Sequence, residues 1–149
     1  MHIAIASDHA GYDLKKELVR FLEEKGHTLH DFGTHGPASV DYPDYARPAA
    51  QAVARGECQR GILICGTGLG MSYVANKVKG IRAAACQGCY SARRSRLDND
   101  ANVLCLGGRV LGVGLAREIV EVWLSTKFSA QARHQRRIKK IEAFEAECG

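Results

Sequence analysis

A short apolar run leads directly into a glycine-rich loop near the middle of the chain. The run is Gly61-Ile-Leu-Ile-Cys65, and the loop is Gly66-Thr67-Gly68-Leu69-Gly70. An apolar run this short, with two β-branched residues, is typical of a strand buried on both faces of a parallel sheet. Helix-like residues follow from about Met71 to Lys77. The pattern therefore predicts a strand, a turn and a helix in direct succession, as in α/β folds.

Strand-like and helix-like segments alternate along the rest of the chain. Further strands are predicted at 2–7, 28–32, 81–86 and 103–106. Further helices are predicted around 14–22, ending at Gly26, and at about 45–54, 91–96 and 114–125. This order implies right-handed crossovers and a Rossmann-like, doubly wound parallel sheet. The predicted fold class is α/β, a three-layer α/β/α sandwich formed by residues 1–149 as one domain, with a basic C-terminal helix at about 129–147.

The composition agrees with one ordinary domain. With 149 residues, 46% hydrophobic and 25% charged, the chain can form one core and is too apolar for disorder. No apolar run approaches the ~18–20 residues of a membrane span, and no basic and apolar signal segment opens the chain. We therefore expect a cytoplasmic protein that does not bind membranes and whose six cysteines are reduced thiols.

Two of the cysteines have C-x-x-C spacing, in Cys86-Gln-Gly-Cys89. A zinc site needs two more ligands nearby, and no second pair follows, so no metal site is predicted. A redox pair usually opens a helix after a strand, and this pair stands at such a predicted junction. The alternative is that both cysteines only fill space at the end of a strand.

Basic residues gather near the C-terminus. Between residues 127 and 140 there are six Lys or Arg and no Asp or Glu: Lys127, Arg133, Arg136, Arg137, Lys139 and Lys140. Such a stretch can bind nucleic acid, bind a small phosphate or form a solvated helix face. No aromatic platform or known reading motif accompanies the charge, so nucleic acid is not the expected partner.

Polar clusters lie next to several of the predicted strands. Ligands of doubly wound sheets bind outside the carboxyl ends of the strands. Three clusters are expected at that edge: Asp8-His9, residues 65–70, and Asp98-Asn99-Asp100. The glycine loop opens a helix, whose free N–H groups attract anions. Because the loop matches neither a Walker sequence nor the dinucleotide spacing, it favours a phosphate or oxyanion site.

Cys65 stands directly before those N–H groups. A positive helix end stabilises a thiolate, which can act as a nucleophile or as a general base. No activating histidine is evident for a nucleophile. The alternative is that Cys65 is a small buried residue without a chemical role.

Five segments together resemble type B ribose-5-phosphate isomerase and its relatives, which include the galactose-6-phosphate isomerase subunits. They are SDHAGYDLK, DYPDYA, GILICGTGLGMSYVANKVKGIRAA, NDANVLCLGGRV and ARHQRR, and the resemblance extends from residue 3 to about residue 141. It implies an α/β/α sandwich that forms a homodimer or a dimer of dimers, with sites shared across the interface. It also implies that a phosphorylated aldose and ketose are interconverted without metal or nucleotide cofactor.

The resemblance also assigns roles to individual residues. Cys65 would be the general base that moves a proton between C1 and C2 of the open-chain sugar, and Thr67 would pass a proton between O1 and O2. Backbone N–H groups would hold the charge of the cis-enediolate, an oxyanion-hole arrangement formed by Gly66, Gly68, Leu69 and Gly70. The other contacts would be Asp8, Tyr42 and Asn99 to the sugar, and His9, Arg109, Arg133 and Arg137 to the phosphate.

Two positions distinguish this chain among the proteins that it resembles. Some members lack the cysteine and carry a glutamate base at the position of Met71, whereas here the cysteine is present. In many members a histidine stands directly before the Asn-Asp pair, and this histidine opens the furanose ring. Here Asp98 takes the place of that histidine. A carboxylate is a poor proton donor near neutral pH. Asp98 would therefore accept a proton from the anomeric hydroxyl, or donate one if burial kept it protonated.

We therefore expect an isomerase of ribose 5-phosphate and ribulose 5-phosphate, with Cys65, Thr67 and Asp98 as catalytic residues. Asp98 leaves two alternatives open. The natural substrate is another sugar phosphate, such as a tetrulose or hexose phosphate, or the protein binds a sugar phosphate without converting it.

Overall fold

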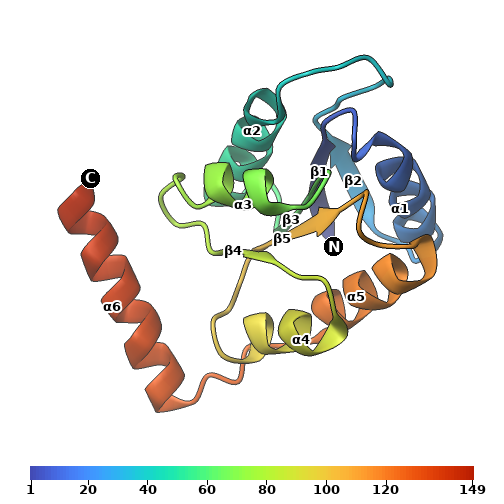
Figure 1. Cartoon of the computed structure of the whole chain (residues 1–149). Coiled ribbons are helices and arrows are strands. Elements are labelled where there is room, and N and C mark those ends of the chain that lie inside the picture. Colours follow the sequence, from blue (N-terminus) through green and yellow to red (C-terminus); the bar gives the residue numbers. More distant parts are fainter.

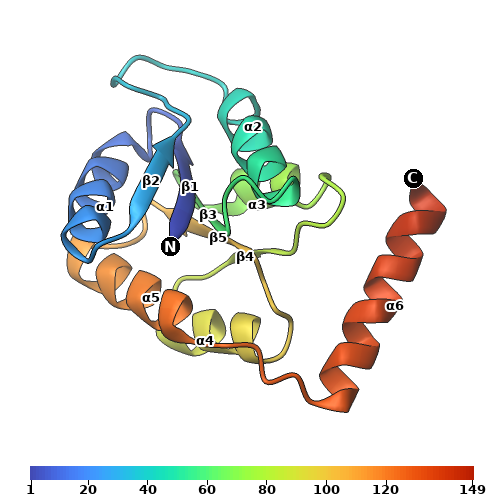
Figure 2. The same cartoon turned by 180° about the vertical axis from the view of Figure 1, so that it is seen from behind.

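Five parallel strands form a single sheet in the computed structural model, which describes all residues 1–149. The strands are β1 (His2–Ser7), β2 (Thr28–Asp31), β3 (Arg60–Cys65), β4 (Ala83–Ala85) and β5 (Val103–Gly107). Their order across the sheet is β2-β1-β3-β5-β4, as Figure 1 and Figure 2 show from opposite sides. The predicted parallel α/β sheet is confirmed.

Helices cover both faces of this sheet. One face carries α1 (Tyr12–Glu24), α4 (Cys89–Leu97) and α5 (Val113–Ser125), and the other carries α2 (Tyr42–Ala54) and α3 (Leu69–Ala75). The chain changes face between α1 and α2, and β1 lies beside β3 in the sheet. The carboxyl ends of β1 and β3 therefore form the topological switch point at which such folds bind ligands.

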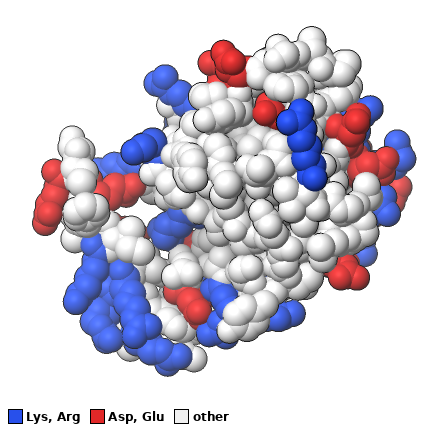
Figure 3. Space-filling model, in the orientation of Figure 1, with Lys and Arg blue, Asp and Glu red and all other residues white.

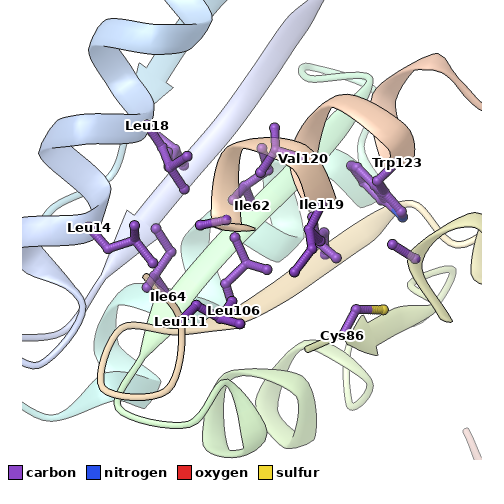
Figure 4. Close-up of a cluster of buried hydrophobic side chains, with 14 of the residues drawn as sticks. Leu14, Leu18, Ile62, Ile64, Cys86, Leu106, Leu111, Ile119, Val120 and Trp123 are labelled. Carbon is purple, nitrogen blue, oxygen red and sulfur yellow. The ribbon is translucent and has the colours of Figure 1, made fainter. Parts of the chain in front are cut away.

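Successive residues of each strand point to opposite faces of the sheet and form two separate cores. Ile3 and Ile5 pack under α1 and α5, whereas Ala4 and Ala6 pack under α2 and α3. Figure 4 shows part of the first core, where Leu18, Ile62 and Trp123 converge from different elements. The second core is rich in alanine, which allows α2 to lie close to the sheet: Ala46, Ala49, Ala50 and Ala52 are fully buried.

Helix α2 begins three residues earlier than predicted. It starts at Tyr42 instead of about Tyr45, so that Pro43 belongs to its first turn and not to the preceding loop. Proline fits there because the first N–H groups of a helix have no intrahelical acceptor, and its fixed φ is already helical. This early start brings Tyr42 to the end of α2 that faces the glycine loop.

The last helix, α6 (Ala132–Cys148), projects away from the rest of the molecule (Figures 1 and 2). It begins later than the predicted residue 129, because Ala130 has a positive φ of 56° and Gln131 is the N-cap. Most of the side chains of α6 are exposed, and Lys and Arg gather over the first turns of this helix (Figure 3). None of the helices has the length and apolar character that crossing a membrane requires.

Candidate active site

Asp8 shapes the turn between β1 and α1. Its carboxylate accepts hydrogen bonds from the N–H groups of Ala10 (2.9 Å) and Gly11 (3.0 Å), and only 6% of the residue is exposed. Asp8 therefore organises the first loop of the switch point through one carboxylate oxygen. The other oxygen has no protein donor, which leaves it available to a ligand.

The loops after β1, β3 and β5 approach one another so closely that only glycine fits between them. A Cβ atom at Gly11 would lie 2.4 Å from the Ile64 carbonyl oxygen, and one at Gly108 would lie 2.6 Å from the Ala10 carbonyl oxygen. Gly68 has a φ of +82° and its Cβ would lie 3.0 Å from the Leu106 carbonyl carbon. Three strand ends are thereby held together around one small region.

Cys65 is buried at the centre of this region. It is the last residue of β3, only 5% is exposed, and the N–H group of Gly68 donates a hydrogen bond to its Sγ (3.2 Å). The next two residues are more exposed to solvent than Cys65, since Gly66 is half-buried and Thr67 is exposed. Cys65 therefore belongs to the second core and also places its sulfur within hydrogen-bond distance of the loop that follows it.

The glycine loop also offers free hydrogen-bond donors. The N–H groups of Gly66, Thr67 and Gly70 donate to no protein acceptor. The Leu69 N–H donates to Thr67 Oγ1 (3.2 Å), which leaves the Thr67 hydroxyl proton free to donate elsewhere. Groups of this kind can stabilise negative charge on an oxygen beside the Cys65 sulfur.

Cationic and polar side chains surround the loop at the same edge. Arg109 lies over Gly66, where a Cβ atom would be 3.6 Å from Arg109 Cδ. The Val40 N–H donates to His9 Nδ1 (3.1 Å), so a neutral His9 carries its proton on Nε2. The ring of Tyr42 lies against Gly70. One chain thus brings together six of the predicted site elements: Asp8, His9, Tyr42, Cys65, residues 66–70 and Arg109.

Asp98 and Asn99 are not part of this assembly, and the prediction that they lie at the carboxyl edge of the sheet is wrong for a single chain. They follow α4 and precede β5, whose first residue Val103 pairs with Gly61. Gly107, at the other end of β5, pairs with Cys65. Four residues of strand span about 13 Å. The connection from α4 therefore delivers both side chains to the amino edge.

Arg133 and Arg137 also lie apart from Arg109. Both are exposed on α6, which starts near the end of α4, where the Ser129 N–H donates to the Leu97 carbonyl (3.2 Å). One chain thus presents two groups of predicted site residues, one around Cys65 and one around Asn99 and the start of α6.

Asp98 is engaged in an ion pair. Arg94, one turn earlier on α4, contacts both carboxylate oxygens of Asp98, at 3.0 and 2.8 Å. The buried His134 of α6 lies 3.6 Å from the same carboxylate and also bonds Ser129 Oγ (2.7 Å). Sequence reasoning missed both partners. The i, i+4 spacing of Arg94 and Asp98 is a detectable signal, whereas the contact with His134 depends on how α6 docks.

Lys15 is a second residue that sequence reasoning missed. Its side chain is almost fully buried and donates to Asp31 Oδ1 (2.7 Å) and to the Thr34 carbonyl (2.6 Å). These bonds hold the start of the loop that later supplies the Val40 N–H to His9. Helical spacing puts Lys15 on the face of α1 that carries Leu18 and Leu22, and its neighbour Lys16 lies on the exposed side.

Comparisons with known proteins match nearly the whole chain to one family. The profile of the ribose/galactose isomerase family matches residues 3–141. Ribose-5-phosphate isomerase B of Escherichia coli is 50% identical over 143 residues, which are 96% of this chain and 95% of that protein. D-erythrulose-4-phosphate isomerase of Pectobacterium atrosepticum is 48% identical over 130 residues, 86% of this chain and 85% of that one.

A solved structure is also very similar. Ribose-5-phosphate isomerase B of Clostridium thermocellum superimposes with a TM-score of 0.98 at 54% identity, and the match covers 100% of both chains. Likeness of this extent covers the sheet, the loops around Cys65 and the C-terminal helix together. The chain therefore belongs to the ribose/galactose isomerase family of enzymes.

Proposed function

We propose that this protein interconverts ribose 5-phosphate and ribulose 5-phosphate, with Cys65 as the general base. The observation that carries the proposal is the position of the Cys65 sulfur beside a loop with free N–H groups. The names of its E. coli and C. thermocellum relatives support the same substrate pair.

In this reaction Cys65 removes the C2 proton of the open-chain aldose and returns it to C1. The intermediate is a cis-enediolate, whose negative oxygens O1 and O2 accept hydrogen bonds from the N–H groups of residues 66–70. Thr67 passes a proton between O1 and O2, because its hydroxyl oxygen already accepts the Leu69 N–H and its proton is free. The contact from Gly68 N–H aims the sulfur toward the reacting carbons.

The phosphate end of the substrate binds to cationic and N–H donors. His9 contributes Nε2–H, since its Nδ1 accepts the Val40 N–H. Arg109 contributes a guanidinium group above the glycine loop. Asp8 and Tyr42 contact the sugar hydroxyls from the two sides of the loop.

A second copy of the chain completes the site. We infer that Asn99, Arg133 and Arg137 reach the sugar and phosphate from a partner subunit, because in one chain they lie away from Cys65. Exposed Ile141 and Phe144 of α6 line a cleft of about 720 Å³ together with Ile81, and apolar surface of this kind favours a protein partner. The assembly is a homodimer or a dimer of dimers.

Six free cysteines fit a cytoplasmic location.

The direct test is turnover of ribose 5-phosphate by the purified protein, compared with the Cys65→Ala variant. General-base catalysis contributes about 10²–10⁴-fold to the rate, so kcat is expected to fall by that factor without loss of the fold. Cys58→Ala is the matched control, because Cys58 is equally buried in the same core but lies away from the loop. Unchanged activity of Cys65→Ala would contradict the mechanism.

The identity of residue 98 favours one second candidate, an isomerase of erythrulose 4-phosphate. The Asp98 carboxylate is bound on both oxygens by the Arg94 guanidinium, so both oxygens are already engaged within the chain. An acyclic tetrulose phosphate requires no ring opening, and one relative is named for that substrate. If kcat/KM is higher for erythrulose 4-phosphate, and Asp98→His raises the value for ribose 5-phosphate alone, the second candidate is correct. Loss of activity toward both sugars in Asp98→Ala would instead assign Asp98 a role common to both reactions.

A further inference from the structure

The C-x-x-C sequence occupies a junction between a strand and a helix. β4 ends at Ala85, the Cys86 N–H donates to the Cys105 carbonyl (3.1 Å), and Cys89 is the first residue of α4. Gln87 and Gly88 form a bend between them. Dithiol pairs of oxidoreductases stand at such strand–helix junctions. Neither cysteine takes part in the isomerase site described above.

Both side chains pack against the same group of buried residues. Cys86 is a member of the apolar core under α4 and α5, with 2% exposed, and Cys89 packs against that core from the surface. Figure 4 shows Cys86 at the margin of this core, on the side nearest to α4. Both cysteines therefore lie against one core, three residues apart in the chain, which is the spacing of the dithiol pairs in C-x-x-C motifs.

The two thiols differ in access to solvent. Cys89 is half-buried, whereas Cys86 is shielded, and burial raises the pKa of Cys86 to about 11, an effect that a hydrogen bond with Ser95 opposes. The N–H groups of Cys89, Tyr90 and Ser91 have no protein acceptor, so the positive end of the α4 dipole lies beside Cys89. A reagent from solvent therefore meets Cys89 first, and Cys86 stands behind it as the second thiol.

We propose that Cys86 and Cys89 form a reversible dithiol–disulfide pair that exchanges with low-molecular-weight disulfides such as glutathione disulfide. The Cys89 sulfur attacks the glutathione disulfide, its S–S bond breaks, and one glutathione thiolate leaves. The Cys86 thiol loses its proton and attacks the Cys89 sulfur of the mixed disulfide, and the second glutathione leaves. The two cysteines are oxidised by two electrons, one glutathione disulfide is reduced to two thiols, and the two cysteine protons pass to them.

The experiment uses the full-length, reduced protein in glutathione buffers of increasing disulfide fraction. After acid quenching and alkylation, trypsin releases residues 83–93, a peptide that contains these two cysteines and no other, because Arg82 and Arg93 flank it. The expected result is a peptide that loses both alkylation sites and two hydrogen masses as the disulfide fraction rises. Dithiothreitol restores the alkylated form. A peptide that stays alkylated at both cysteines throughout would overturn the proposal.

Single variants separate the two steps of the exchange. Cys86→Ser and Cys86→Ala are expected to trap glutathione on Cys89, whereas Cys89→Ser is expected to leave Cys86 alkylated. Two replacements at residue 86 separate the loss of the thiol from a folding defect at this buried position. Cys148→Ser, which removes an exposed cysteine elsewhere, is expected to leave the 83–93 disulfide unchanged. Equal trapping of glutathione in the wild type and in Cys86→Ser would refute a resolving role for Cys86.

Discussion

The ring of Tyr42 lies directly on the backbone of Gly70, so that a Cβ atom at residue 70 would be 2.7 Å from Tyr42 Cζ. We therefore predict that Gly70→Ala displaces the Tyr42 ring from the glycine loop while the fold is retained. The KM for ribose 5-phosphate should rise several-fold, and kcat should change less. Steady-state kinetics, together with a thermal melt of the variant, checks this prediction.

Two further variants isolate that contact. Gly114→Ala is the matched control, because a Cβ atom there meets open space in a helix and alanine favours helix by about 0.5–1 kcal/mol. If displacement of Tyr42 is the cause, Gly70→Ala in a Tyr42→Ala background adds little further loss. Additive losses in the double variant would contradict the explanation.

Complementary inactive variants test whether sites are shared between subunits. A mixture of Cys65→Ala and Arg137→Ala, unfolded and refolded together, should recover activity that neither variant shows alone. The expected recovery is about a quarter of the wild-type rate, because half of randomly paired dimers are hybrids and each hybrid contains one intact site. The absence of recovery, with hybrids shown by native mass spectrometry, would place Arg137 in the same site as the Cys65 of its own chain.

Neighbouring lysines on α1 are expected to differ sharply in their contribution to stability. Lys15→Met leaves the Asp31 carboxylate with only the Gly33 N–H as donor and the Thr34 carbonyl with none, so we predict a loss of about 2–4 kcal/mol in the free energy of unfolding. Lys16→Met removes an exposed ion pair with Asp13 and should change the free energy of unfolding by less than about 1 kcal/mol. Urea denaturation of both variants provides the comparison. Similar losses would show that burial of Lys15 is not what makes it important.

Buried thiols should lower the stability of the protein at alkaline pH. Burial raises the pKa of Cys86 from 9.0 to about 11, and it also raises the pKa values of Cys58 and Cys105. Above the ordinary thiol pKa the unfolded chain releases protons that the folded chain keeps, so the free energy of unfolding falls as pH rises. Below it both states are protonated, and the contribution of the thiols is fully present.

The contribution of the Cys86 thiol to the decline in the free energy of unfolding can be measured. Between about pH 8 and about pH 10 the decline should be smaller by about 1 kcal/mol in Cys86→Ala than in the wild type. Cys148→Ala should retain the wild-type decline, because Cys148 is exposed. Urea midpoints at both pH values give the slopes, and equal slopes in all three proteins would exclude Cys86 as a source.

The strands and most of the helices follow from local patterns, and so does the loop of Cys65. The run from Gly61 to Cys65 is apolar at every position after its first, and β3 is buried over those same residues. Periodicities of two and 3.6 residues are properties of neighbouring side chains, so a single sequence contains them. The start of α2 was harder to predict, because Pro43 suits both a loop and the first turn of a helix.

The contacts of individual site residues depended on the tertiary structure. Which face of α1 is buried decides that Lys15 is enclosed and Lys16 is not, and the docking of α6 decides that His134 lies beside Asp98. The pairs of Lys15 with Asp31 and of His134 with Asp98 join residues from different elements, and no spacing along the chain encodes these partners. The roles of Asn99, Arg133 and Arg137 are implied by resemblance to a family, and in one chain these residues lie away from Cys65.

Local patterns in the sequence are enough to predict the order of strands and helices and a cysteine followed by a glycine loop, because both depend on residues within one turn or strand of each other. Which residues lie at the same edge of the sheet is seen only when the elements are assembled. Each crossover helix returns the chain to the amino edge, so Asp98 and Asn99, at the end of α4, lie opposite Cys65, at the end of β3. Residues that precede a parallel strand and residues that follow it are separated by the full length of the strand.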